Sequence, residues 1–199
     1  MATADLLVVG LGNPEAEFAG TRHNVGADAV RLVAERHSVT LRSERGLHAR
    51  IGTARTASRT LVLAVPTTYM NDSGIAVRAL VKRYLSLGPG GFEPGALAIV
   101  QDELDLAPGV VRVKIGGGTA GHNGLRSIQS HLRHLDFVRV RIGVGKPPGR
   151  AAGASHVLKR PSKAERDLLD VAVHVAADAV EVLFEEGPEA AMNRFNTKA

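Results

Sequence analysis

The chain contains no cysteine and no tryptophan, and aromatic residues make up only 4% of its 199 positions. The absence of cysteine excludes disulfides, thiolate metal sites and a cysteine nucleophile, although it does not assign a compartment. The longest apolar runs are far too short to cross a bilayer. The first residues, MATADLLVVGLGNP, contain neither the basic segment nor the cleavage site of a secretory leader. We therefore expect a cytoplasmic protein without a membrane partner.

The residues that are present suit one globular domain with a mild excess of positive charge. Apolar residues make up 44% of the chain, and its length is that of a single domain with a single core. The formal charge is +5 and the sequence pI is about 10.0. An excess of this size permits an anionic partner but equally fits ordinary surface charge, so the placement of the basic residues has to decide.

The hydrophobic pattern alternates between strands and helices. Strands are predicted at 6–9, 47–54, 60–65, 96–101, 110–115 and 138–144. Helices are predicted at 25–37, from 71 or 73 to 85, at 121–133, from the capping box at 162–165 to about 187, and at 189–195. This alternation predicts one α/β domain over residues 1–199, with a mixed, twisted β-sheet flanked by α-helices. Segment 146–154, KPPGRAAGA, has no apolar period and is interpreted as either a mobile lid or a plain connector.

Two glycine-rich turns resemble nucleotide-binding loops but lack the residues that such loops need. In GLGNPE (residues 10–15) a proline removes a backbone donor, and a glutamate stands at the third glycine of the dinucleotide fingerprint. In GGGTAGHN (116–123) the final His-Asn stands where a P-loop has Lys and Ser or Thr to contact phosphate and Mg²⁺. A nicotinamide-dependent oxidoreductase and an NTPase are therefore disfavoured, and no cofactor is expected.

Polar side chains follow several of the predicted strands. They are Asn13, His23, Asn71, Asp102 and Asn123. Because open α/β sheets place their sites beyond the carboxyl ends of strands, we expect these side chains to converge in one crevice. The competing interpretation is ordinary structure, since most of the eight histidines are expected at the surface and loop asparagines commonly form turns or caps.

A histidine paired with an aspartate is typical of a general base and the group that orients it. The chain has no cysteine and no G-x-S-x-G nucleophile elbow, so water is the expected nucleophile. Asparagine amides are uncharged and can donate to a developing oxyanion or contact an ester or amide. Metal ligation is chemically open, but no His-x-x-x-His or His-Glu-x-x-His spacing occurs, so no metal is predicted. The pattern favours hydrolysis at a neutral carbonyl centre.

Six motifs, in this order, resemble the bacterial-type peptidyl-tRNA hydrolase family. They are GLGNP (10–14), TRHNVG (21–26), PTTYMNDSG (66–74), DELDL (102–106), GGGTAGHNG (116–124) and RIGVGKP (141–147). The resemblance covers nearly the whole chain. It implies an enzyme that hydrolyses the ester between a peptide and the 3′-terminal ribose of tRNA, releasing tRNA and peptide from aborted translation. It also implies a monomer with a mixed sheet flanked by helices and with no metal or organic cofactor.

The resemblance assigns roles to the matching residues. His23 would be the general base that activates water, Asp102 would hold it in its basic form, and Asn13 would help to select peptidyl over aminoacyl substrates. The peptide and the 3′ CCA end of the tRNA would be bound by Phe18, Tyr69, Met70, Asn71, His122 and Asn123. A non-catalytic RNA-binding module would explain the basic charge but would leave this set of His, Asp and Asn without a purpose.

The family resemblance also organises the basic residues. Contacts to phosphates of the acceptor stem are expected from Arg112, Lys114, Arg126, Arg133 and Arg141, with Arg139, Lys146 and Arg150 as further candidates. Such contacts give affinity without sequence readout, which suits an enzyme that acts on many tRNAs.

Two positions depart from the family pattern. Glu15 stands where the family usually has glycine, and we expect it to weaken binding of a phosphate-bearing tRNA end slightly unless it points away. Phe18 stands where tyrosine is usual, so it keeps a stacking ring and loses a hydroxyl.

Overall fold

The computed structural model describes residues 3–14, 16–147 and 153–197. Its strands are β1 (Leu6–Gly10), β2 (Arg42–Glu44), β3 (Ala49–Arg55), β4 (Thr60–Pro66), β5 (Leu97–Glu103), β6 (Val111–Ile115) and β7 (Val138–Gly143). Its helices are α1 (Val25–Arg36), α2 (Ser73–Tyr84), α3 (Asn123–Leu132), α4 (Gly153–Val157), α5 (Lys163–Glu186) and α6 (Pro188–Phe195). Short 3₁₀ turns are η1 (Ala16–Phe18), η2 (Arg22–Asn24), η3 (Met70–Asp72) and η4 (Pro94–Ala96).

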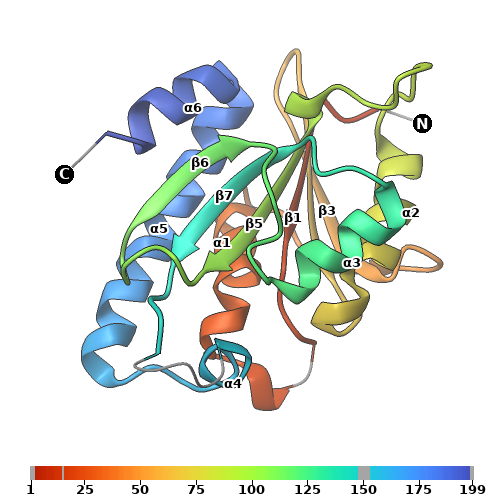
Figure 1. Cartoon of the computed structure of the whole chain (residues 1–199). Coiled ribbons are helices and arrows are strands. Elements are labelled where there is room, and N and C mark those ends of the chain that lie inside the picture. Colours follow the sequence, from red (N-terminus) through yellow and green to blue (C-terminus); the bar gives the residue numbers. More distant parts are fainter. Residues whose placement is uncertain (1–2, 15, 148–152, 198–199) are drawn as a thin grey trace.

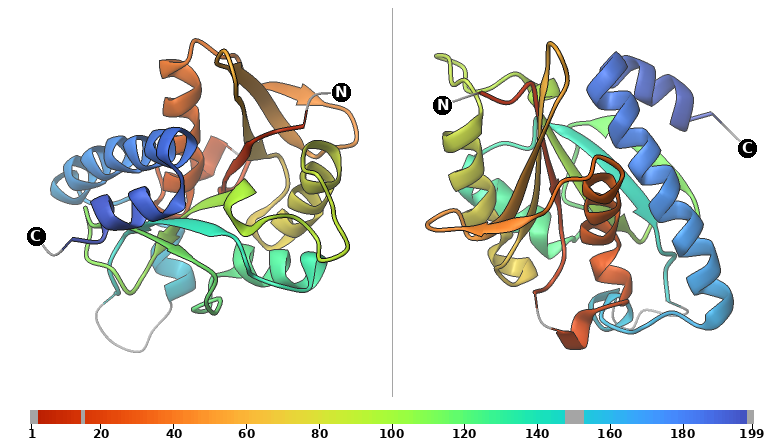
Figure 2. Two further views of the ribbon diagram at one scale, coloured as in Figure 1. Left: turned by 90° about the horizontal axis from the view of Figure 1, so that it is seen from above. Right: turned by 180° about the vertical axis from the view of Figure 1, so that it is seen from behind.

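One mixed sheet organises the molecule, with the strand order β2-β3-β4-β1-β5-β7-β6. The four central strands, β4, β1, β5 and β7, run parallel, while β2, β3 and β6 pair antiparallel at the two edges. Helices cover both faces, α2 and α3 on one side and α1 and α5 on the other (Figures 1 and 2). The predicted mixed α/β sheet flanked by helices is confirmed.

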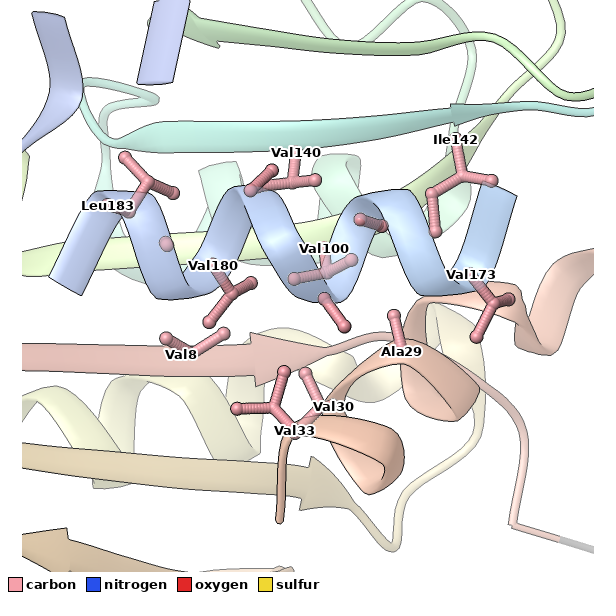
Figure 3. Packing of buried hydrophobic residues seen from close by; sticks show 14 of the residues in the cluster. Val8, Ala29, Val30, Val33, Val100, Val140, Ile142, Val173, Val180 and Leu183 are labelled. Atoms are coloured by element: carbon pink, nitrogen blue, oxygen red, sulfur yellow. The ribbon is translucent and has the colours of Figure 1, made fainter. Parts of the chain in front are cut away.

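The alternation of side chains along the strands builds a core on each face of the sheet. Val8 and Val100 point towards α1 and α5, where they meet Val30 and Val180 in the larger cluster (Figure 3). Their neighbours along the strands point the other way, so Val9 packs with residues of α2 and α3. Because β1 and β5 are buried on both faces, they read in the sequence as nearly continuous apolar runs.

Two glycines bring the start of α1 against the ends of β1 and β5. A Cβ atom added at Gly26 would lie 2.2 Å from the carbonyl oxygen of Val100, and one added at Gly10 would lie 2.4 Å from that of Gly26. Only glycine permits this approach of backbone to backbone. It places η2, which immediately precedes α1, at the carboxyl ends of the central strands.

The elements differ from the sequence prediction in three respects. The strand expected to end at residue 101 continues to Glu103, because Asp102 and Glu103 pair with Ile142 and Gly143 of β7. The short edge strand β2, whose three residues are all exposed, has no apolar pattern and was not predicted. Within the segment predicted to be loop, α4 begins at Gly153.

Some expectations fall on residues outside the description. Glu15, Arg150 and most of the proposed lid lie among residues 15 and 148–152, which the structure does not describe. Over the described part of the chain, no helix combines the length and the apolar character that crossing a membrane requires.

Candidate active site

Three side chains meet at the carboxyl ends of the central strands. The Nδ1 atom of His23 lies 2.8 Å from Oδ1 of Asp102, and Nε2 of His122 lies 3.0 Å from the same oxygen. His23 comes from η2, Asp102 from β5, and His122 precedes the first residue of α3. His23 and Asp102 are 6% and 3% exposed, so their contacts are sheltered from water. The predicted convergence of His23 with Asp102 matches this arrangement, and His122 is an additional partner.

The hydrogen bonds define which nitrogen of each neutral ring carries the proton. The backbone N–H of Leu125 donates to Nδ1 of His122 at 3.3 Å, so neutral His122 carries its proton on Nε2 and donates it to Asp102. His23 donates from Nδ1 to the same carboxylate, which leaves the lone pair on its Nε2. His23 is therefore arranged as a base, whereas both nitrogens of His122 are already engaged.

Asp102 is an ionised carboxylate in this setting. Burial alone would raise its pKa, but the two adjacent imidazoles, His122 and then His23, outweigh that effect and hold the pKa well below its usual range. An ionised Asp102 stabilises the imidazolium that forms when His23 accepts a proton.

The same three residues are the one group among the described residues with metal-ligand chemistry and spacing, since their ligand atoms all lie within 4.8 Å of one another. A metal ion would need a lone pair on Nε2 of His122, and the proton would then have to sit on Nδ1. There it would face the N–H of Leu125, which is itself a donor. The local hydrogen bonding therefore favours two donors on one carboxylate over a set of metal ligands.

A cavity of about 150 Å³ opens beside the three residues. Its polar side includes His23, Asp102 and Asn123, and its apolar side includes Leu104 and Val157. Arg126 also lines it and lies 3.4 Å from Oδ1 of Asn123 through its Nη1 atom. Gly153, Ala154 and Val157 of α4 also line the cavity, and α4 lies beyond the carboxyl ends of β5 and β7 (Figure 1).

Asn13 is held by a second network beside η2. Its side-chain Oδ1 accepts the backbone N–H of Met70 at 2.8 Å, and its backbone exchanges two hydrogen bonds with the side chain of Asn24, at 2.9 and 3.0 Å. Within the described residues, no hydrogen bond engages the side-chain N–H donors of Asn13. Asn24 directly follows His23, so its bonds to Asn13 connect η2 to the turn after β1. Its place in the TRHN motif was the available signal, although only His23 was selected from that motif.

The other predicted site residues lie outside the described lining of the cavity. Met70 is 4% exposed, whereas Tyr69, which precedes it, is 48% exposed, and Asn71 is also exposed. Phe18 is half-buried in η1. Of the five side chains expected in one crevice, His23, Asp102 and Asn123 line the cavity, whereas Asn13 and Asn71 are outside its described lining. Met70 of η3 donates its backbone N–H to Asn13.

The basic residues of β6 and β7 fall into two groups. Arg139 is 1% exposed and donates to the carbonyls of Gly117 and Gly118, so it supports the glycine turn. Arg112 donates from Nη1 to the carbonyl of Phe195 in α6, at the edge of the sheet. Lys114 and Arg141 belong to the other group, with Arg141 lying 3.6 Å from Glu103.

Lys114 sits in an unfavourable field. Partial burial and then the nearby guanidinium groups of Arg141 and Arg139 lower its pKa from the usual value. A bound anion would relieve this repulsion between like charges. Lys146 differs, because its Nζ is paired with a carboxylate oxygen of Asp105 at 2.5 Å.

Comparison with known proteins identifies the family. The model of the peptidyl-tRNA hydrolase family matches residues 7–199. The chain belongs to the peptidyl-tRNA hydrolase family. The peptidyl-tRNA hydrolase of Mycobacterium tuberculosis is 46% identical over 189 residues, which cover 95% of this chain and 96% of the relative. That of Cutibacterium acnes is 45% identical over 201 residues, covering 96% and 98%.

A solved structure agrees with the same family. The crystal structure of peptidyl-tRNA hydrolase from Acinetobacter baumannii matches with a TM-score of 0.86 at 37% identity, covering 99% of this chain and 97% of that one. The family predicted from the six motifs is thereby confirmed, and so is the fold that the peptidyl-tRNA hydrolase resemblance implied.

Proposed function

We propose that this chain hydrolyses the ester between a peptide and the 3′-terminal ribose of peptidyl-tRNA, with water activated by His23. The observation that carries the proposal is the pair of imidazoles on one buried carboxylate, with Nε2 of His23 left as the basic atom. Membership of the peptidyl-tRNA hydrolase family supplies the substrate class. The uncharged amides near the cavity suit an ester carbonyl.

The steps follow from these positions. His23 takes a proton from water on Nε2, and the resulting hydroxide adds to the ester carbonyl to give a tetrahedral oxyanion. The imidazolium is stabilised by ionised Asp102, which already accepts the Nδ1 proton. When the oxyanion collapses, the bond to the ribose oxygen breaks and His23 returns its proton to that oxygen. The products are free tRNA and a peptide carboxylic acid, which releases its proton to solvent.

His122 acts in this scheme through Asp102. Its Nε2 proton occupies one lone pair of Oδ1, which fixes the carboxylate in the plane that His23 needs. It also accepts the Leu125 N–H as the N-cap of α3, so it ties the start of that helix to the catalytic aspartate. We assign His122 as a positioning residue beside its predicted place at the substrate.

The asparagines supply the neutral donors. Asn13 presents side-chain N–H groups beside Met70, and Asn123 stands at the cavity wall beside Arg126. Donors aimed at a developing oxyanion are worth roughly 10²–10³ in rate in related chemistry. Asn71, exposed on η3, would contact the 3′ CCA end or the peptide, and Tyr69, which is 48% exposed, would stack on a base.

Phosphates of the acceptor stem would bind basic residues, of which Arg126 lines the cavity. Lys114 and Arg141 are the strongest candidates because they share one cationic field, and Arg126 and Arg133 lie on or after α3 with exposed side chains. Arg112 is a weaker candidate, since a carbonyl of α6 already holds its Nη1 atom. We further propose that residues 1–199 act as one domain, as a cytoplasmic monomer, and without a metal ion.

The decisive experiment is release of the blocked amino acid from N-acetyl-aminoacyl-tRNA. Wild-type enzyme should turn over, and His23→Ala should lose about 10²–10⁴ of the rate, the usual contribution of a general base. Turnover should persist in a chelator. A His23→Ala variant that is as fast as wild type, with a normal unfolding midpoint, contradicts the proposal. A chelator that abolishes turnover contradicts its metal-free part.

A further inference from the structure

A buried arginine lies directly before the catalytic histidine, and the hydrolytic mechanism does not use it. Arg22 is 5% exposed, and its guanidinium contacts the chain more than 130 residues later. The Nη2 atom donates to both carboxylate oxygens of Glu165, each at 2.9 Å. Both bonds are charge-assisted and therefore stronger than neutral ones, although they come from one nitrogen and not from the paired fork of two guanidinium nitrogens.

The other half of the guanidinium holds the chain between α4 and α5. The Nη1 atom donates to the carbonyl oxygens of Lys159 at 3.1 Å, Arg160 at 3.3 Å and His156 at 3.4 Å. The backbone N–H of Arg22 also donates to Lys159, at 3.4 Å. Three carbonyls at the end of α4 thus converge on one side chain from η2.

Glu165 is also held by hydrogen bonds at the start of its own helix, α5. It is the acidic residue of the capping box of α5, where it accepts from the backbone N–H and the hydroxyl of Ser162 at 3.0 and 2.8 Å. Its hydrogen bonds to Arg22 and Ser162 lower its pKa to about 2. The start of α5 and the end of α4 are therefore anchored together on Arg22.

The anchored segment forms part of the catalytic cavity. Gly153, Ala154 and Val157 of α4 line the same cavity as His23 and Asp102. Val157 is 5% exposed and packs into the larger core. Ala154 and Ser155, in the same helix, are exposed.

We propose that Arg22 is a positioning residue that fixes α4 as a wall of the substrate cavity. The proposal rests on the hydrolase function, because its main readout is binding of peptidyl-tRNA. We call the contacts of Arg22 with Glu165 and the end of α4 the clasp. His23 does not depend on the clasp for its own placement, since Asp102 holds its ring and the next residue, Asn24, is bonded to the backbone of Asn13. Loss of the clasp should therefore disturb substrate binding more than the chemical step.

The test uses Glu165→Gln, which keeps the shape of the side chain and removes its charge. We expect KM for N-acetyl-aminoacyl-tRNA to rise about 5- to 20-fold, which corresponds to about 1–1.8 kcal/mol, while kcat changes less than twofold. The pH profile of kcat should keep its shape. Arg22→Lys should behave like Glu165→Gln, because one ammonium cannot serve the carboxylate and three carbonyls together.

The chain offers a matched control in Arg36. This arginine of α1 also contacts acidic residues of α5, at 2.8 Å from Asp178 and 3.3 Å from Glu181, but away from the cavity. Arg36→Gln should leave KM unchanged. Hydrogen exchange adds a second readout: amides 153–160 should exchange faster in Glu165→Gln than in wild type or Arg36→Gln, with no change in the amides of β5.

The outcomes separate this proposal from the proposed function. A wild-type enzyme without turnover rejects the hydrolase function. An active wild type with Glu165→Gln at unchanged KM and unchanged exchange rejects the clasp alone. If Glu165→Gln and Arg36→Gln lower the unfolding midpoint and raise KM equally, the contact is only structural and the proposal also fails.

Discussion

The trio of His23, Asp102 and His122 differs physically from the basic face of β6 and β7, which carries Lys114 and Arg141. In the trio, three of the four ring nitrogens have a defined partner, and one buried carboxylate oxygen receives two imidazole donors. On the basic face, Arg141 lies 3.6 Å from the carboxylate of Glu103, and its charge acts on Lys114. The trio is fixed by geometry, so a single atom should matter greatly. The basic face works by accumulated charge, so its members should be partly interchangeable.

The largest effect should come from Asp102→Asn. The amide can no longer accept from both imidazoles as an anion, and it presents N–H groups that favour the wrong tautomer of His23. We expect kcat to fall about 10³–10⁴-fold, by analogy with loss of the orienting aspartate in a catalytic triad, with KM within threefold. Steady-state kinetics on N-acetyl-aminoacyl-tRNA measures both. A loss confined to KM would show that Asp102 binds substrate and does not orient the base.

Substitution of His122 tests whether the second imidazole on Asp102 contributes to turnover. Removing it by His122→Ala removes the largest influence that lowers the pKa of Asp102, so that pKa should rise. The carboxylate also loses one of its two imidazole donors and is held less firmly for His23. We expect kcat to fall about 10- to 100-fold near neutrality. His122→Gln, whose amide can still donate to Asp102, should recover part of the loss, and an unchanged kcat in His122→Ala would contradict this role.

The fold was more predictable from the sequence than the contacts within the trio. Strands β1 and β5 and helix α5 were predictable because their apolar periods are strong and α5 begins with a capping box. Asn13, His23 and Asp102 were identified from strand ends and family motifs. The partnership of His122 with Asp102 was not, because the residues are 20 positions apart and no local period links them.

Arg22 illustrates the same limit on prediction from sequence. In the TRHN motif it reads as an ordinary cation near the surface, and its burial depends on carbonyls more than 130 positions away. The same holds for α4, whose five residues carry no clear apolar stripe. Long-range hydrogen bonds to backbone atoms leave no pattern of residue types, so only the folded chain reveals them.

The basic face should respond to charge in a graded way. Lys114→Gln and Arg141→Gln should each raise KM about three- to tenfold at low salt and leave kcat nearly unchanged, because phosphate contacts supply affinity without chemistry. The double variant should flatten the dependence of log(kcat/KM) on log[salt] by about one to two units of slope, near one per lost contact. Arg50→Gln, an exposed cation on β3, is the control. A double variant with the wild-type slope would remove these residues from the tRNA path.

The smallest effect should appear in stability at acid pH, which reports on the contact between Arg22 and Glu165 in the absence of substrate. The pKa of Glu165 is lowered from 4.5 to about 2, so its ionised form stabilises the folded chain above pH 4.5 and loses that contribution as the pH falls towards 2. Glu165→Gln lacks this term. Its unfolding midpoint should lie a few degrees below that of wild type at pH 6, and the gap should close between pH 4.5 and 2, as followed by thermal melts. Because both proteins share every other carboxylate, the difference isolates Glu165. A gap that stays constant with pH would mean that folding does not lower the pKa of Glu165, and that its contact with Arg22 owes its strength to hydrogen-bond geometry and not to charge.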